Sequence, residues 1–215
     1  MDDLNSFATV SFSLTQIEQV LSVNRDLALS KKGRELVLCY HWVMTLIDES
    51  EHWNDPRLIK SDVRLGFPIN PKSVEHKFSL QEILESRKIV IDEDVDVVLS
   101  LTSDKAELPY RIQVTRLYNY QRRDQKIDDL LKLIEKKSSV QADPNVWLVI
   151  GVEEKLKFDI KELVKALQTM NIPFGAIYLC GLLSEKEHYH FSYYRILPDF
   201  AHYSRIVSFA DGVVC

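Results

Sequence analysis

Apolar and polar positions follow a helical period through most of the first 50 residues. Thr15 and Glu18 form a capping-box pattern at a first amphipathic stretch, and a second helix is expected to begin near Ser30. Residues 36–47 are apolar on almost every face. A helix of this kind is either buried or part of a subunit interface, and we favour burial.

Turn-forming residues interrupt this pattern between positions 52 and 78. Pro56, Pro68 and Pro71 stand there, together with Gly66 and Asn70. They predict an irregular connection, either an inserted loop or a hinge. A further capping box, formed by Ser79 and Glu82, then opens a short helix.

A change to short apolar runs predicts three strands after residue 87. They are expected at 88–91, 95–101 and 110–117. A polar connection over 102–109 separates the last two strands.

The remaining apolar runs alternate between helical and extended patterns. A helix is expected over 127–134, a buried strand over 146–152, and then a helix capped by Asp159. A second buried strand follows over 174–183, and 190–197 is an edge strand or a hairpin partner. This order predicts an α/β protein with a mixed central sheet, in which a three-strand meander precedes helix–strand–helix–strand.

The length of 215 residues allows one or two domains. Hydrophobic residues make up 46% and charged residues 27%, which is an ordinary globular balance. The change in pattern divides the chain into an N-terminal helical segment with its irregular connection (1–78) and an α/β domain (79–215). We expect the α/β domain to form one compact unit.

Charge and cysteine content narrow the functional classes. The formal net charge of −5 argues against a dedicated nucleic-acid binder, but it leaves room for an enzyme with a local basic groove. The three cysteines are widely spaced and fit neither a disulfide framework nor a zinc site. No apolar run approaches the roughly 20 residues that span a bilayer, and the acidic N-terminus is no secretory signal. We therefore expect a cytoplasmic protein that makes no membrane contact.

Two neighbouring strands carry polar residues suited to a hard cation. Asp96 lies on the strand over 95–101, and Gln113 shares one face of the next strand with Thr115. If the two strands pair antiparallel, Asp96 and Gln113 lie near each other. A carboxylate beside an amide oxygen and a backbone carbonyl fits Mg²⁺, which uses one or two carboxylates and keeps several waters.

The order of a helix, three meandering strands, a helix and a strand over about residues 79–153 resembles the core of the PD-(D/E)XK nuclease superfamily. The resemblance implies a restriction-endonuclease-like fold and hydrolysis of DNA or RNA phosphodiesters with Mg²⁺ or Mn²⁺. Asp96 matches the aspartate of the second strand, and Gln113-Val-Thr115 matches the acidic-x-Lys pair, whose first residue is Gln in some members. The resemblance thus implies that Asp96, Gln113 and the carbonyl of Val114 hold the metal.

Thr115 stands where the resemblance expects a lysine. That lysine would supply positive charge to the attacking water and the developing transition state, and a threonine cannot do so. Arg123 is the first replacement to consider, because it continues the inward stripe of the next helix. Arg111 is the second, because it shares the face of Gln113.

The family often places a glutamate on its first helix. Glu35 is our preferred match, since Glu82 already has a capping role. The candidate catalytic set is therefore Asp96, Gln113, Thr115, Arg123 and Glu35.

Each of these residues also has a purely structural interpretation. Asp96 could simply start a strand, Gln113 and Thr115 could lie on a solvated strand face, and the basic residues of 116–126 could form a solvated helix start. A protein that kept this fold but lost catalysis would serve as a binding or assembly subunit. It would form a homo-oligomer or meet a protein partner through residues 36–47.

A third interpretation rests on histidines and aromatic residues near the C-terminus. His188 and His190 could hold a metal with His202, although no acidic or cysteine ligand nearby completes the set. The aromatic residues of 189–194 could stack on bases, and packing within a sheet is the favoured role.

Overall fold

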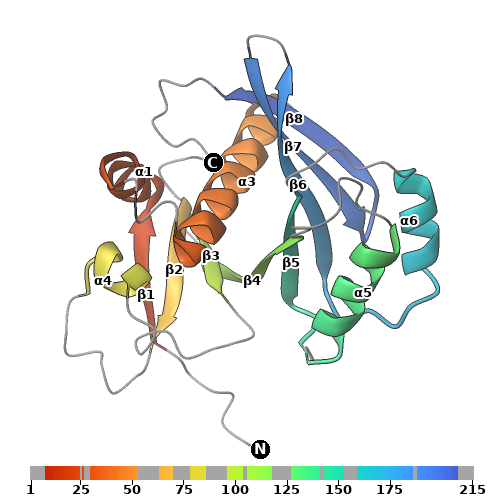
Figure 1. Ribbon diagram of the computed structural model, residues 1–215. Helices are drawn as coiled ribbons and strands as arrows, with labels where there is room; N and C mark the ends of the chain where they lie inside the picture. The colour runs from red at the N-terminus through yellow and green to blue at the C-terminus, as the bar shows by residue number, and fades with distance from the viewer. Residues whose placement is uncertain are drawn as a thin grey trace, which may run out of the picture.

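The computed structural model describes residues 8–24, 26, 30–52, 63–69, 78–85, 96–103, 106–117, 127–140, 143–152, 159–185 and 188–207. One eight-stranded sheet runs through them in the order β1 to β8 (Figure 1). Its strands are β1 (Ala8–Ser13), β2 (Val63–Ile69), β3 (Val97–Ser103), β4 (Ala106–Leu117), β5 (Val146–Val152), β6 (Ala176–Glu185), β7 (His188–Leu197) and β8 (Ala201–Val207). The helices are α1 (Leu14–Val23), α3 (Lys31–His52), α4 (Leu80–Glu85), α5 (Ile127–Ser138) and α6 (Ile160–Leu167).

The sheet is mixed, as the sequence predicts. Strands β1 to β4 pair antiparallel, β4, β5 and β6 pair parallel, and β6, β7 and β8 pair antiparallel. Helices α5 and α6 lie in the two connections between the parallel strands, where a crossover is required. Strands from both sides of position 78 belong to this one sheet.

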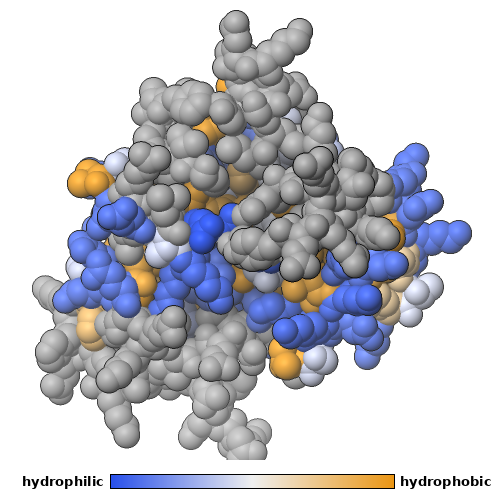
Figure 2. All heavy atoms as spheres, in the orientation of Figure 1, coloured by the Kyte–Doolittle hydropathy of each residue, from blue (hydrophilic) through white to orange (hydrophobic). Residues whose placement is uncertain are grey.

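Helices cover both faces of the sheet and bury a separate apolar cluster on each. Side chains of α1, α3 and α4 pack on one face, which we call the α3 face. Side chains of α5 and α6 pack on the other, which we call the α5 face. In Figure 2 hydrophilic side chains dominate the coloured surface over α5 and α6, as expected for amphipathic helices that lie on a sheet.

The apolar helix is buried, and this part of the prediction is confirmed. Every side chain from Leu36 to Val43 has at most 7% of its surface exposed. Cys39 on α3 and Cys180 on β6 lie in the same cluster, and burial raises the pKa of both thiols. No described helix has both the length and the apolar character of a membrane span.

Helix starts follow local capping chemistry. The box at Ser79 and Glu82 is present, and the hydroxyl of Ser30 accepts a hydrogen bond from the N–H of Gly33 at the start of α3. The first box is formed by Ser13 and Gln16 instead of Thr15 and Glu18. The chain leaves β1 directly into α1, so the last extended residue becomes the N-cap.

Several sequence-based boundaries are wrong. The region 52–78 contains strand β2, and the first 50 residues contain strand β1. Strand β4 begins at Ala106, inside the predicted connection 102–109. Strand β7 is the hairpin partner of β6, as the second predicted alternative has it, and it is not an edge strand because β8 pairs along its outer side. The predicted strand 88–91 lies outside the described residues.

Candidate functional site

Within the described residues β3 begins between two longer neighbours, and we call the place where it begins the notch. The first residue of β3, Val97, pairs with Ile112, and β4 continues past this point to Leu117. On the other side β2 continues past Gly66, the partner of Val98, to Ile69. Backbone groups of β2 and β4 therefore extend beyond the end of β3, and Asp96 lies at the base of this notch.

Asp96 is bonded to the backbone of β4 on both sides of Gln113. Its N–H donates to the carbonyl oxygen of Ile112 at 2.9 Å, and its Oδ2 accepts from the N–H of Val114 at 2.7 Å. The N–H and C=O of a strand residue point the same way, so the carbonyl of Val114 is directed to the same side as its N–H. The structure thus brings Asp96 next to Gln113 and Val114, as expected from antiparallel pairing.

The side chains of β4 divide between the two faces of the sheet. Gln113 pairs with Leu148, which belongs to the cluster on the α5 face. Ile112 and Val114 belong to the cluster on the α3 face. Gln113 and the half-buried Thr115 therefore point toward α5 and α6.

Gln113 does not lie on a solvated strand face, since only 1% of its surface is exposed. Among the described residues no donor bonds its Oε1, which is itself buried. Burying an amide oxygen without a hydrogen-bond donor costs free energy, and in proteins a cation or an ordered water usually satisfies such an oxygen.

Glu35 approaches Asp96 from the α3 face. Both residues line a small pocket that is partly open to solvent. Lys32 stands at the rim, and the remaining wall is apolar, formed by Leu36, Phe67, Ile83, Leu84 and Val97. The structure thus places a carboxyl group of the long helix and the acid at the base of the notch in one pocket.

The position of Glu35 in this pocket changes the pKa of its carboxyl group. Burial, followed by the negative charge of Asp96, raises the pKa of Glu35 from 4.5 to about 7. Three positive charges lower the pKa of Glu35, those of Lys31, Lys137 and Arg116. Within the described part of the chain, Glu35 has no ion pair within 4 Å. Its carboxyl group is therefore able to exchange a proton near neutral pH.

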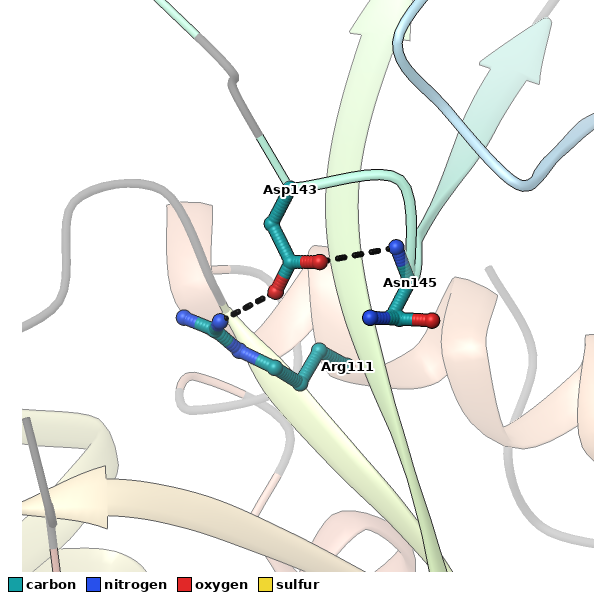
Figure 3. Close-up of polar contacts among 3 residues, drawn as sticks. All are labelled: Arg111, Asp143 and Asn145. Atoms are coloured by element: carbon teal, nitrogen blue, oxygen red, sulfur yellow. Dashed lines mark hydrogen bonds and ion pairs between the residues drawn. The ribbon is translucent and has the colours of Figure 1, made fainter. Parts of the chain in front are cut away.

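Other candidates lie away from this pocket or have another role. The guanidinium of Arg111 is bound to Asp143 at 2.6 Å (Figure 3). The N–H of Asn145, and then Arg111, lower the pKa of Asp143. Glu82 accepts hydrogen bonds from Ser79 as the cap of α4. Arg123 lies outside the described residues.

His190 and His202, the two of these histidines whose side chains are described, do not lie together as metal ligands. His202 pairs with Tyr194 in the ladder, and the two rings stack at 4.3 Å. His190 lies four residues along β7 from Tyr194, a separation of roughly 13 Å at the usual rise per residue. The side chain of His188 is not among those described. In the described ranges no three His, Cys, Asp or Glu side chains come together as metal ligands.

The aromatic residues of β7 serve mainly the core. Phe191 and Tyr193 are buried against α3, which confirms sheet packing for these two. Their neighbours on the α3 side form a polar network that sequence analysis missed. Tyr193 donates to Glu49, and Tyr203 donates to Asp48.

Arg205 extends this network into the interior. Its guanidinium donates to the hydroxyl of Thr45 at 3.2 Å and lies 2.9 Å from Nδ1 of His41. Because a guanidinium has no acceptor, Nδ1 of His41 accepts this bond. The network ties β7 and β8 to the second half of α3, on the same face as the Glu35 pocket.

No protein-family model, no curated protein and no solved structure matches this chain significantly. The chemistry of the site therefore rests on its own geometry. The sequence identified Glu35 and Asp96, which the structure brings together. It did not anticipate that Arg116, which shares a strand face with Ile112 and Val114, lowers the pKa of Glu35.

Proposed function

We propose that the chain is a metal-dependent phosphodiester hydrolase of the nuclease type, with a restriction-endonuclease-like core, acting on DNA or RNA. The observation that carries this proposal is the pairing of Glu35 and Asp96 in one pocket at the notch. The order of α3, β2, α4, β3, β4, α5 and β5 supports it, because apart from the short helix α4 this is a helix, three antiparallel strands, a helix and a parallel strand. The same order defines the nuclease core that the sequence resembles.

The residues at the notch fit a hard divalent cation. Asp96 offers a carboxylate and Val114 a carbonyl directed to the same side as its bonded N–H, whereas the buried amide of Gln113 points to the α5 face and would have to turn to join them. Oxygen ligands of this kind suit Mg²⁺ or Mn²⁺. A bound cation would lower the pKa of a water ligand and offset charge on a phosphate.

Glu35 is suited to proton transfer in the same pocket. A general base works best when its pKa lies near the working pH, and the pKa of Glu35 is about 7. Its half-buried carboxyl group faces the pocket next to Asp96. In the proposed reaction it accepts the proton of the attacking water.

Cleavage assays test the proposal directly. Labelled DNA and RNA are incubated with Mg²⁺ or Mn²⁺ and the wild type, Asp96→Ala, Asp96→Asn or Glu35→Gln. We expect cleavage by the wild type and a loss of about 100-fold or more in the variants. Asp128→Ala, which removes an exposed carboxylate from α5, is the matched control and should retain activity.

Binding of Mn²⁺ measured by calorimetry provides a second readout. It should weaken in both Asp96 variants and persist in Asp128→Ala. Asp96→Asn keeps an acceptor for the N–H of Val114, so it separates loss of the site from loss of folding. No cleavage by the wild type, or equal cleavage by the Asp96 variants, would contradict the proposal.

A second candidate function is a nuclease-like fold that has lost catalysis and acts as a binding or assembly subunit. Two observations favour it: Thr115 stands in the position expected for lysine, and one carboxylate oxygen of Asp96 is already bonded to Val114. Burial of Leu36–Val43 means that this helix cannot be the interface, which must lie elsewhere. A stable oligomer in solution that binds no Mn²⁺ would support this candidate, and a monomer that binds Mn²⁺ would oppose it.

A further inference from the structure

The second half of α3 lies against the two outer strands β7 and β8 (Figure 1), and His41 is a buried polar residue at this contact. Only 1% of its surface is exposed. Its ring stacks on Phe191 of β7, with the ring centroids 5.4 Å apart. Phe191 and Arg205 are partners in the ladder between β7 and β8, so the imidazole meets both strands at one point.

Arg205 reaches His41 from the outer strand β8. A terminal nitrogen of its guanidinium lies 2.9 Å from Nδ1 of His41, and its Nε donates to the hydroxyl of Thr45 at 3.2 Å. That hydroxyl donates in turn to the carbonyl oxygen of His41 at 2.7 Å. Arg205 is therefore bonded to two buried side chains that lie one helical turn apart on α3.

The bond to Arg205 requires a neutral imidazole. A guanidinium has only donors, so Nδ1 of His41 must carry a lone pair and the ring proton must lie on Nε2. A proton added at Nδ1 would turn the acceptor into a donor and place a second positive charge beside the guanidinium, in the protein interior. The closed contact therefore excludes that proton.

Of the two elements joined by this contact, β8 is held less firmly. Helix α3 is buried along Leu36–Val43. Strand β8 is the last strand of the described sheet and pairs there with β7 alone, and its Ile206 is 60% exposed. Elements with few buried contacts open at a lower free energy than the core does. Loss of the bonds made by Arg205 should therefore loosen β8 first.

Other charged groups near this contact have bonds of their own. Asp48 and Glu49, in the same part of α3, accept hydrogen bonds from the hydroxyls of Tyr203 and Tyr193. Arg195 on β7 donates to a backbone carbonyl oxygen in the turn before β8. These groups surround the contact between histidine and arginine and do not replace it.

Few of the neighbouring titratable groups change charge between pH 5 and 8. Burial raises the pKa of the phenols and thiols on this side of the sheet, which stay protonated over this range: Cys39, Tyr178, Cys180, Tyr193 and Tyr203. Glu35, at the other end of α3, has a pKa of about 7. Burial lowers the pKa of His202, which lies on the opposite face of β8. The last two groups therefore need control variants.

We propose that His41 and Arg205 form a pH-sensitive latch, which holds β8 against α3 while the imidazole is neutral and releases the strand when the imidazole takes up a proton. The latch is independent of the proposed function, since neither side chain lines the pocket of Glu35 and Asp96. The closed latch excludes the proton, whereas the open one has the ordinary histidine pKa of about 6.5. Opening should therefore become about tenfold more frequent for each pH unit below that value.

Amide hydrogen exchange of the full chain measures this opening. Exchange over Ala201–Val207 is followed by mass spectrometry at about pH 7.5 and about pH 5.5, and each rate is divided by the intrinsic rate of an unfolded peptide at that pH. Protection of β8 should fall about tenfold at the lower pH, while protection of β5 stays the same. Equal protection of β8 at the two pH values, or an equal fall in β5, would overturn the latch.

Two variants separate the latch from other effects of pH. His41→Asn keeps an acceptor near the position of Nδ1 but cannot take up a proton, so β8 should be equally protected at both pH values. Arg205→Met removes the bond at every pH, so β8 should exchange fast at both. A fall in protection that persists in either variant would contradict the proposal.

Glu35→Gln and His202→Gln are the matched controls, because each removes another group that titrates in or near this range. Both should keep the fall in protection that the wild type shows. If the fall disappears in one of these controls and persists in His41→Asn, the proton acts at the control residue and the latch does not exist.

The protonation state of His41 can also be measured without a variant. Long-range ¹H–¹⁵N correlation spectra of protein labelled in its histidines report which ring nitrogen carries the proton. At about pH 7.5 the proton should lie on Nε2, and the imidazolium should form over the same pH range in which β8 loses protection. A proton on Nδ1 at neutral pH, or an imidazolium that forms while β8 stays protected, would overturn the latch even if the variants failed to fold.

Discussion

The backbone N–H of Val114 donates a hydrogen bond of 2.7 Å to the carboxylate of Asp96. Val114 lies on β4 beyond the last described residue that pairs with β3. The side chain of Asp96 accepts the hydrogen bond that a strand partner would otherwise accept. One acidic residue therefore completes the sheet locally and also forms the base of the candidate site.

Replacing Asp96 should affect stability as well as activity. Asp96→Ala leaves the buried N–H of Val114 without an acceptor, at a cost of about 1–3 kcal/mol. Asp96→Asn keeps an acceptor and should cost about 1 kcal/mol or less. Urea unfolding of the two variants measures the difference. Equal stability would show that the hydrogen bond does not contribute.

Glu35 should make stability depend on pH in a defined direction. Its pKa is about 7 in the folded chain, above its ordinary value of 4.5, so between these values only the folded chain keeps the proton. The contribution of Glu35 to stability is therefore present below about pH 4.5 and is lost as the pH rises through 7.

Glu35→Gln removes this dependence. The variant should match the wild type near pH 4.5 and exceed it at pH 8 by on the order of 2 kcal/mol, a value reduced for partial solvent screening. Urea unfolding at the two pH values provides the comparison. A constant difference between variant and wild type across this range would exclude a raised pKa.

Gly151 should not tolerate a side chain while Leu38 is present. Gly151→Ala places a methyl group 2.7 Å from the side chain of Leu38, and overpacking of this kind costs about 1–3 kcal/mol. Leu38→Ala opens the space, so the double variant should be more stable than the sum of the single costs implies. A double-mutant cycle by chemical denaturation measures this coupling. Strict additivity would contradict the close contact.

Arg205 should hold the edge strand β8 against α3. Arg205→Met removes hydrogen bonds to Thr45 and His41 while keeping the apolar stem, at a cost of about 1.5–3 kcal/mol. Amide hydrogen exchange should become faster over Ala201–Val207 and remain unchanged in β5. Ser204→Ala, an exposed change on the same strand, is the control.

Strand β2 was missed because its turn-forming residues have structural roles within a strand. Gly66 lies so close to β1 that an added Cβ would stand 2.3 Å from the side chain of Thr9. Pro68 lies past Gly66, where the pairing with β3 ends, so a missing N–H on that side removes no ladder bond. These contacts come from strands distant in sequence, and composition alone cannot reveal them.

Strand β8 was missed for a different reason. Its inward positions include Arg205, and its outward positions include Ile206, which is 60% exposed. The usual alternation of apolar and polar residues is therefore inverted at these two positions, because the inward arginine is satisfied by α3.

Part of the candidate site could not be predicted from the sequence either. Sequence alternation correctly separates Gln113 and Thr115 from Ile112 and Val114, but it does not say which set faces Glu35. The register with β5 and the crossovers through α5 and α6 decide that question. That register places Ile112, Val114 and Arg116, and not Gln113 or Thr115, on the face of Glu35.

Burial of α3 has a consequence for the order of folding during synthesis. The helix is complete at residue 52, yet it contacts residues that are made much later: Tyr193 bonds Glu49 across 144 positions of the chain, and Arg205 bonds Thr45 across 160. Until these strands are synthesised, the nascent chain carries a long apolar helix whose core-facing side chains are not yet buried. The final packing of α3 must therefore wait for β7 and β8, and contacts of such long range favour slow folding and dependence on chaperones.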